Sequence, residues 1–279
     1  MLSIPPVIAF DEYARPGREE LDLEVGALLI ASDAYPHLAI DAELARLDAL
    51  AVGLDAEALA ALPVEDAAAA LAEHLFRRHG FRGNEADYGD PRNSYLNEVL
   101  ERRLGIPISL SIVLLALARR VGVKAHGVSF PGHFLVRFER PRSGPLVVDP
   151  FHGGRAMSHG DLERLLRRSA GPSAKLQVDH LKPAAPRAIL TRVLQNLKST
   201  FLARGDLPRA LVAAARIVTL VPREPWAVRD RGILQAQLGA LGGARNDLLR
   251  YLELAPEASD VAAVRKVLTR MGGRAATLN

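Results

Sequence analysis

Residues that could carry out nucleophilic catalysis occur along one stretch in the order hydroxyl, imidazole, carboxylate. Ser109 and Ser111 come first, His133 follows, and Asp149 comes last. A serine attacks a carbonyl only when a base accepts its proton, and an aspartate can orient that base. We therefore select Ser109, His133 and Asp149 as a candidate triad, with Ser111 as the alternative nucleophile.

Two asparagines precede this stretch. Asn93 and Asn97 are four residues apart, so they share one face of a helix predicted over 93–104. A pair of amides could bind an oxyanion or orient the base. Alternatively, Asn93 caps the helix and Asn97 faces water. Both interpretations stay open.

Other potential ligands do not form a recognisable metal motif. The chain has no cysteine, which excludes thiol catalysis, thiolate metal sites and disulfides. His126 lies in a predicted strand without a visible partner, and His152 lies in a glycine-rich loop. We assign neither histidine to the site, and we expect no metal and no cofactor.

The two serines are predicted to lie in the first turn of a buried helix from about 107 to 120. Pro107 suits a first turn, the segment is apolar almost all round, and Gly122 stops it. Unpaired N–H groups and the positive end of the helix dipole gather at such a start. An oxyanion or an activated nucleophile gains most there.

Three strands are predicted after this helix, over 123–130, 133–139 and 146–149, with tight turns between them. They form an antiparallel sheet packed on the buried helix, which is an α+β arrangement. In such a sheet the start of the second strand lies beside the end of the third. His133 and Asp149 should therefore lie within about 2.6–3.2 Å of each other.

The rest of the chain is predicted to be mainly helical. Helices are expected over 22–31, 40–53, 63–79 and 157–169, and one more short strand over 176–181. Pro183 to Pro186 reads as a linker, which gives a first domain of 1–182 and a second of 187–279.

The second domain shows an internal repeat with an offset of 34 residues, which is typical of tetratricopeptide helix pairs. Two repeats span about 188–222 and 223–256, and a terminal helix follows over 261–271. The residues that match across the offset are Gly205 with Gly239, Leu207 with Leu241, Ala210 with Ala244, Leu220 with Leu254, and Pro222 with Pro256.

Composition limits the classes of function. The chain has 279 residues, a net charge of +4 and 49% hydrophobic residues, which suits packed soluble domains. No run approaches the roughly 18 apolar residues of a membrane helix. No dense basic run with aromatic residues supports nucleic-acid binding. We expect a cytoplasmic protein that binds neither membranes nor nucleic acid.

The motifs resemble a known family. The chain resembles the bacterial transglutaminase-like proteins with C-terminal tetratricopeptide repeats. The resemblance rests on the repeat and on three motifs, which are Asp90-Pro-Arg-Asn-Ser-Tyr-Leu-Asn, Phe130-Pro-Gly-His-Phe-Leu-Val-Arg and Val148-Asp-Pro-Phe. Members of that family are often labelled invasion-gene regulators. The resemblance implies a transglutaminase-like, papain-like core and an intracellular bacterial protein. It matches His133 and Asp149 to the superfamily's His and Asp.

The nucleophile departs from the resemblance. Catalytic relatives begin the buried helix with a cysteine, where this chain offers Ser109 or, as the alternative, Ser111. We therefore favour a peptide- or protein-binding pseudoenzyme or scaffold with a regulatory role. The alternative is a Ser-His-Asp hydrolase or acyltransferase acting on an amide or ester.

The expected partner is a protein or peptide, with an acidic segment favoured by arginines in the repeat region. These arginines outnumber the nearby acids; they are Arg216, Arg223, Arg229, Arg231, Arg245 and Arg250.

Overall fold

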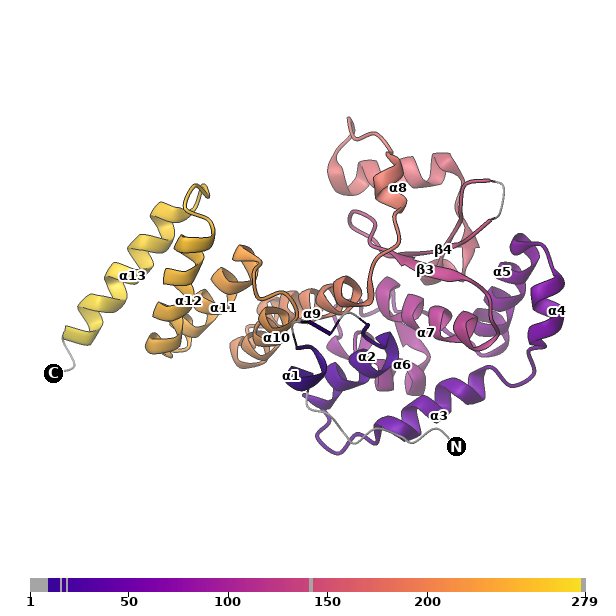
Figure 1. The fold of residues 1–279 in the computed structure, drawn as a ribbon, viewed down its shortest axis with the longest axis horizontal. Helices are drawn as coiled ribbons and strands as arrows, with labels where there is room; N and C mark the ends of the chain where they lie inside the picture. Colours follow the sequence, from indigo (N-terminus) through magenta and orange to yellow (C-terminus); the bar gives the residue numbers. More distant parts are fainter. Residues whose placement is uncertain (1–9, 16, 19, 141–142, 277–279) are drawn as a thin grey trace. The chain divides into compact units, whose positions relative to one another are not determined.

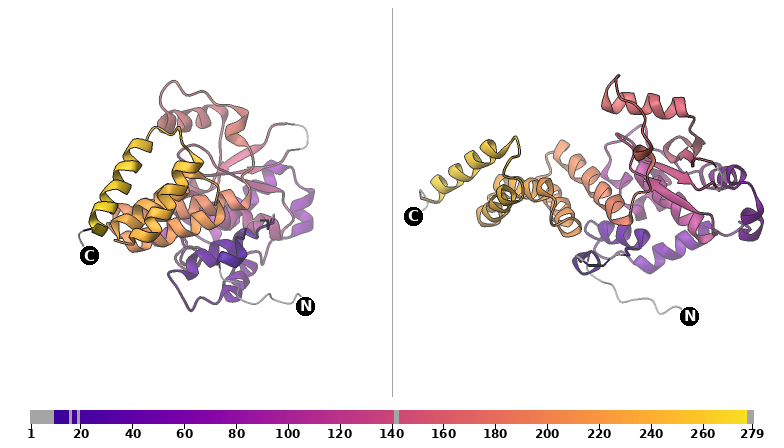
Figure 2. Two further views of the ribbon diagram at one scale, coloured as in Figure 1. Left: turned by 60° about the vertical axis from the view of Figure 1, so that its left-hand side comes forward. Right: turned by 45° about the horizontal axis from the view of Figure 1, so that its top comes forward.

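The computed structural model describes residues 10–276 apart from 16, 19, 141 and 142, and its side chains up to residue 271. Packing divides them into two compact units (Figures 1 and 2). One unit runs from Glu20 to Val193. The other joins α1 (Phe10–Tyr13) with the residues from Leu194 onward.

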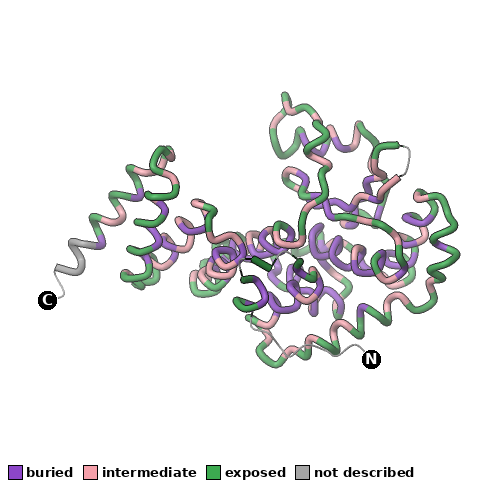
Figure 3. The backbone as a smooth tube through the Cα atoms, in the orientation of Figure 1, coloured by how far each residue is buried: buried purple, intermediate pink, exposed green. Residues whose placement is uncertain are grey.

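Helix α7 (Pro107–Arg120) is the centre of the first unit, as predicted from its apolar sequence. Pro107 occupies its first turn, where a missing N–H costs nothing. Side chains around its whole circumference are buried, including Leu110, Val113 and Leu114 (Figure 3). The helix is therefore a core element on which the other elements of this unit pack.

A four-stranded antiparallel sheet lies next to α7, which confirms the α+β prediction. Its order is β3 (Ala125–Val128), β4 (Leu135–Phe138), β5 (Leu146–Asp149), β6 (Arg155–Ala156). Helix α7 packs against β3 and β4, and helix α8 (His159–Ala170) lies on the opposite side of the sheet (Figures 1 and 2). The sheet is thus buried between two helices.

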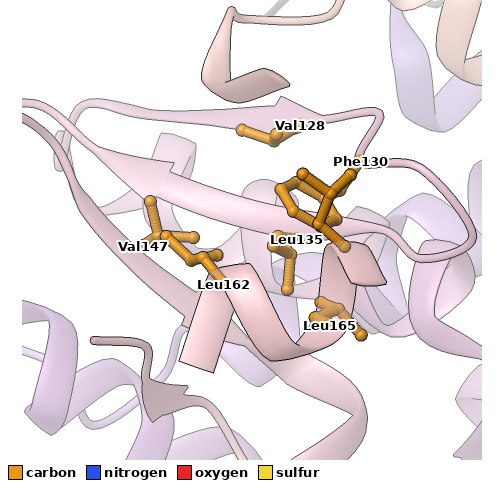
Figure 4. Packing of buried hydrophobic residues seen from close by; sticks show 7 residues of the cluster. Val128, Phe130, Leu135, Val147, Leu162 and Leu165 are labelled. Atoms are coloured by element: carbon orange, nitrogen blue, oxygen red, sulfur yellow. The ribbon is translucent and has the colours of Figure 1, made fainter. Parts of the chain in front are cut away.

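Side chains alternate between the two faces of the sheet along each strand, and those on one face fill the layer between the sheet and α8. Each strand in this layer contributes side chains from one face, and α8 contributes its apolar stripe. Figure 4 shows the cluster, which is made of Val128, Phe130, Leu135, Val147, Leu162, Leu165 and Leu166.

Short helices and loops surround α7 on its other sides. In chain order these elements are α2 (Leu23–Ser32), α3 (Ile40–Leu50), α4 (Ala56–Ala61), α5 (Val64–Ala72), the π-helical turn η1 (Glu73–Arg78), β1 (Arg82–Gly83), the 3₁₀ turn η2 (Pro91–Asn93), α6 (Leu96–Arg102) and β2 (Leu104–Gly105). Strands β1 and β2 form a parallel pair.

Two predicted elements differ from the structure. The helix predicted over 93–104 begins only at Leu96, because Asp90 caps a separate 3₁₀ turn that ends at Asn93. The segment predicted as a strand over 176–181 instead contains the 3₁₀ turn η4 (Val178–Leu181). Local side-chain caps, such as His180 accepting from the N–H of Gln177, override the weak strand pattern there.

The second unit consists of helices in antiparallel pairs. They are α9 (Pro186–Ala203), α10 (Leu207–Leu220), α11 (Pro225–Gln237), α12 (Leu241–Leu254) and α13 (Val261–Ala276). Helices α10 and α12 begin and end 34 residues apart, as the repeat predicts. Asp11 of α1 binds Arg216 of α10 at 2.7 Å.

Helix α9 contributes to both units. Packing divides the chain between Val193 and Leu194, inside α9, and not in the proline-containing segment before it. Ile189 and Leu190 are fully buried, and Ile189 packs over the backbone of Gly127 in β3. The first two turns of α9 are therefore part of the first unit's core.

Candidate functional site

His133 and Asp149 meet at one edge of the sheet. The His133 Nε2 lies 3.0 Å from Asp149 Oδ1, and both side chains are largely buried. His133 occupies the turn before β4 and not the strand itself. That turn has Pro131 and Gly132 at its corner, with φ of +70° at Gly132 and a bond from the His133 N–H to the Phe130 carbonyl. The Phe-Pro-Gly-His sequence thus sets the position of the imidazole.

A second histidine binds the same carboxylate. His152 Nδ1 lies 2.7 Å from Asp149 Oδ2, at the end of the 3₁₀ turn η3 (Pro150–His152). His152, to which the sequence analysis assigned no role, therefore lies beside the candidate pair. The signal that could have found it is the i,i+3 spacing after a strand end, followed by two glycines that close the turn with positive φ.

Asp149 is buried and anionic. Burial raises the pKa of its carboxyl, but the hydrogen bonds and charges of His133 and His152 outweigh this and hold the pKa below its ordinary value. Its Oδ1 also accepts from the N–H of Phe151 at 3.0 Å. The carboxylate therefore orients both rings and its own turn.

The candidate nucleophile Ser109 is bound elsewhere. Its hydroxyl donates to the carbonyl of Asn93 at 2.6 Å and accepts from the N–H of Ile106 at 3.0 Å. The side chain is buried in the first turn of α7, as predicted, but it acts there as a cap of the helix. No hydrogen bond joins it to His133. Of the three groups that were expected to meet, only His133 and Asp149 are joined by a hydrogen bond.

Ser111 is also occupied. Its hydroxyl donates to the carbonyl of Pro107 at 2.7 Å, one turn back in α7, and the residue is fully buried. This back-bonding is the usual way in which a helix satisfies a buried hydroxyl. Ser111 has no hydrogen bond to His133 either.

The two asparagines do not share one helix, because Asn93 ends the turn η2 and Asn97 lies in α6. Asn93 is fully buried, and its amide binds the side chain of Asn84 and the carbonyl of Asp87, which fixes the loop before η2. Its proposed oxyanion or orienting role is therefore corrected to a structural one. Asn97 is buried in α6 with an Oδ1 that has no hydrogen-bond partner, and its role stays a prediction.

Arg192 is a residue that the sequence analysis missed. It lies in the first half of α9 and donates to the Ser129 hydroxyl at 3.1 Å and to the carbonyl of His133 at 3.4 Å. Burial lowers the pKa of its guanidinium, against a smaller opposing effect of Tyr88. No carboxylate in the described part of the chain pairs with this charge.

Aromatic residues join these groups into one site. The ring of Phe151 lies 6.3 Å from that of His133, 5.2 Å from His152 and 5.8 Å from Tyr88. Gly83 makes room for it, since a Cβ there would lie 2.6 Å from the ring. The site thus combines His133, Asp149 and His152 with the ring of Phe151, which forms an aromatic wall beside both histidines. The guanidinium of Arg192 binds the main-chain carbonyl of His133.

Comparison with known proteins identifies the family. Residues 41–195 match the model of the transglutaminase-like superfamily, and residues 197–269 match a tetratricopeptide repeat model. This chain belongs to the transglutaminase-like superfamily. The described part of the chain contains no helix that is long and apolar enough to span a membrane.

Similar proteins occur in several bacteria. A UPF0162 protein of Xylella fastidiosa is 45% identical and covers 88% of this chain and 89% of its own. A UPF0162 protein of Vibrio cholerae is 32% identical over 85% of this chain and 88% of its own. Protein SirB1 of Salmonella typhimurium is 29% identical over 64% of this chain and 66% of its own. These matches also show membership of the UPF0162 family.

Among solved structures, menin matches with a TM-score of 0.41 and 11% identity, over 90% of this chain and 70% of menin. A likeness of this degree does not establish a common fold.

Superfamily membership sets the chemical limits of the site. A transglutaminase-like catalyst needs a nucleophile within hydrogen-bond reach of its imidazole. Here the imidazole and carboxylate are in place, no thiol exists, and both nearby hydroxyls are bound to main-chain carbonyls. The site in this state can bind polar groups through its rings and its guanidinium.

Proposed function

We propose that this protein is a peptide- or protein-binding pseudoenzyme with a regulatory role, acting in the cytoplasm. The observation that supports it is the hydrogen bonding of Ser109. Its hydroxyl donates a hydrogen bond to the Asn93 carbonyl at 2.6 Å, whereas an activated serine donates to the base that will accept its proton. Attack would require this buried bond to break and the side chain to turn toward His133.

The retained His133–Asp149 pair suits binding. An imidazole held by a buried carboxylate offers a fixed, polar ring beside the aromatic wall of Phe151. Peptide carbonyl and N–H groups are natural partners for such a ring, because each needs one hydrogen bond when removed from water. The proposed ligand is therefore an extended peptide segment that binds at the His133–Asp149 site.

Arg192 favours an acidic peptide. A half-buried guanidinium without a carboxylate partner gains most from an anion that enters beside it. The repeat arginines give this idea less support than their number implied, because Arg229 and Arg231 bind Asp230 and Asp247. We therefore attribute the acidic preference to Arg192, beside the His133 site.

The test for binding is a selection of peptides from an unbiased displayed library, with wild-type protein and Arg192→Gln as baits. We expect peptides rich in Asp and Glu to be enriched by the wild type and lost with Arg192→Gln. The matched control is Arg265→Gln, which removes the same charge from an exposed position in α13. Equal enrichment by all three baits would contradict the acidic preference.

The second candidate is a Ser-His-Asp hydrolase or acyltransferase. It is favoured by the intact His133–Asp149 pair and by the place of Ser109 at the start of a buried helix. A fluorophosphonate probe distinguishes the two, because it labels only an activated serine. We expect no labelling of the wild type above a heat-denatured sample. Labelling that disappears in Ser109→Ala and His133→Ala, with both variants still folded, would establish the enzyme instead.

A further inference from the structure

We propose that His133, Asp149 and His152 form a binding site for a divalent transition-metal ion. Each residue offers one donor atom, and the three atoms lie within 4.8 Å of one another. The sequence alone assigned His152 to no site, and the turn η3 is what brings it to the cluster.

The contact distances place the three donor groups close enough to share one ion after a small adjustment. Asp149 lies 3.0 Å from His133 Nε2 and 2.7 Å from His152 Nδ1. Ligands bound at about 2.0–2.2 Å from a tetrahedral or octahedral ion lie about 3.0–3.5 Å apart. Binding of one ion requires the His152 ring to turn its Nδ1 from Asp149 Oδ2 toward the ion, and the ring has room for this because its side chain is 52% exposed.

A role in acid–base catalysis does not explain why a second histidine, His152, binds Asp149. In a catalytic pair, one aspartate orients one imidazole. Here the same buried carboxylate binds two imidazoles, His133 through Oδ1 and His152 through Oδ2. Two imidazoles and a carboxylate are, however, a common donor set for Zn²⁺ and Fe²⁺, whereas Mg²⁺ and Ca²⁺ prefer oxygen ligands.

The surroundings support a built site with an open side. Asp149 is fixed by the N–H of Phe151, and His133 by the corner with Gly132. The exposed edge of His152 provides an entry path, and three protein ligands leave coordination positions for water or a ligand. An ion with one carboxylate keeps a positive charge, which adds to that of Arg192, so an anion would complete the site.

The test is calorimetric titration of the chelator-treated, tag-free protein with Zn²⁺, supported by the visible spectrum of bound Co²⁺. We expect one ion per chain in the wild type and at least tenfold weaker binding in His152→Ala and His133→Gln. The control is His126→Ala, which removes another exposed histidine, 3.7 Å from Glu139, and should bind like the wild type.

Melting curves without metal show whether each variant folds, and Zn²⁺ should raise the melting temperature of the wild type but not of His152→Ala. The proposal is overturned if the wild type binds no Zn²⁺ at micromolar concentration, if His152→Ala binds as tightly, or if millimolar Mg²⁺ displaces the ion. None of these outcomes depends on the peptide selection or on the fluorophosphonate result.

Discussion

At the scale of single residues, the polar contacts of the candidate site converge on Asp149. Its buried carboxylate accepts from His133, from His152 and from the N–H of Phe151. Removing an acceptor with three donors leaves buried N–H groups without partners, which costs more than an average hydrogen bond. The cluster is thus a structural element as well as a candidate site.

We predict that Asp149→Ala lowers the free energy of unfolding by about 2–4 kcal/mol. The measurement is urea denaturation at pH 7 followed by circular dichroism. Asp179→Ala is the matched control, because Asp179 forms an exposed ion pair with Lys182 and should change stability by less than about 1 kcal/mol. Similar losses for the two variants would show that the cluster does not hold the turn.

Residue types predicted the site only in part. The alternation of strands and turns was enough to place His133 beside Asp149, since an antiparallel sheet brings those two positions to one edge. The direction of a hydroxyl is different, because it depends on which carbonyl lies nearby. Ser109 binds the carbonyl of Asn93, which is sixteen residues away in sequence, and no spacing rule foresees that contact.

At the scale of elements, Glu24 joins α2 to the end of α7. It is only 3% exposed, and its two oxygens bind Arg119 at 2.9 Å and Arg120 at 2.8 Å. Both arginines lie in the last turn of α7, where positive charge also complements the helix dipole. The buried glutamate therefore fixes the position of α2 relative to the end of α7, which hydrophobic contact alone would define less well.

We predict that Glu24→Gln lowers the free energy of unfolding by about 1–3 kcal/mol, because both guanidinium groups lose a charged partner. Chemical denaturation at low and at high salt measures it, and the loss should persist at high salt, since a buried pair is screened weakly. Glu163→Gln, which breaks a partly exposed pair with Arg167, serves for comparison. A loss that vanishes in salt for Glu24→Gln would argue against a buried pair.

Helix α8 begins with a capping box whose strength depends on pH. Asp161 accepts from the hydroxyl of Ser158 at 2.7 Å and from its N–H at 3.0 Å. These bonds hold the pKa of Asp161 at about 2, below its ordinary value of 3.8. A lowered pKa in the folded state means that this contribution to stability is complete above pH 4 and is lost as the pH falls toward 2.

We therefore predict that Asp161→Asn is less stable than the wild type at pH 7, and that the difference shrinks as the pH falls from 4 to 2. Urea midpoints of the two proteins across this range measure it. A difference that stays constant down to pH 2 would mean that the carboxylate does not act as the cap.

Elements were predictable where one strong signal decided them. The apolar run after Pro107 specifies α7, and the turns with Pro131 and Gly144 separate the strands. The helix expected from residue 93 begins later, because the carboxylate of Asp90 accepts a hydrogen bond from the N–H of Arg92 and caps a local turn that competes with the helix. Such competition is settled by tertiary contacts and not by the local pattern.

At the scale of the whole molecule, the sequence pattern predicts the repeat period but not the residue at which the two units divide. Small residues recur every 34 positions because each helix pair needs them at its crossing, as at Ala244. The proline-containing segment before α9 marks a change in composition, but the side chains that follow it decide where the first unit ends. Ile189 and Leu190 lie in that unit's core.

The last prediction follows from this division. A fragment of residues 20–186 lacks Ile189, Leu190 and Arg192, whereas a fragment of 20–203 keeps the whole of α9. Each fully buried aliphatic side chain contributes about 1.5–3 kcal/mol, so the shorter fragment should lose roughly 3–6 kcal/mol from these two residues. Thermal melts by circular dichroism should show a cooperative transition for 20–203 and a much lower or absent one for 20–186. If the two fragments melt alike, the first turns of α9 are dispensable, and the unit ends where the composition changes.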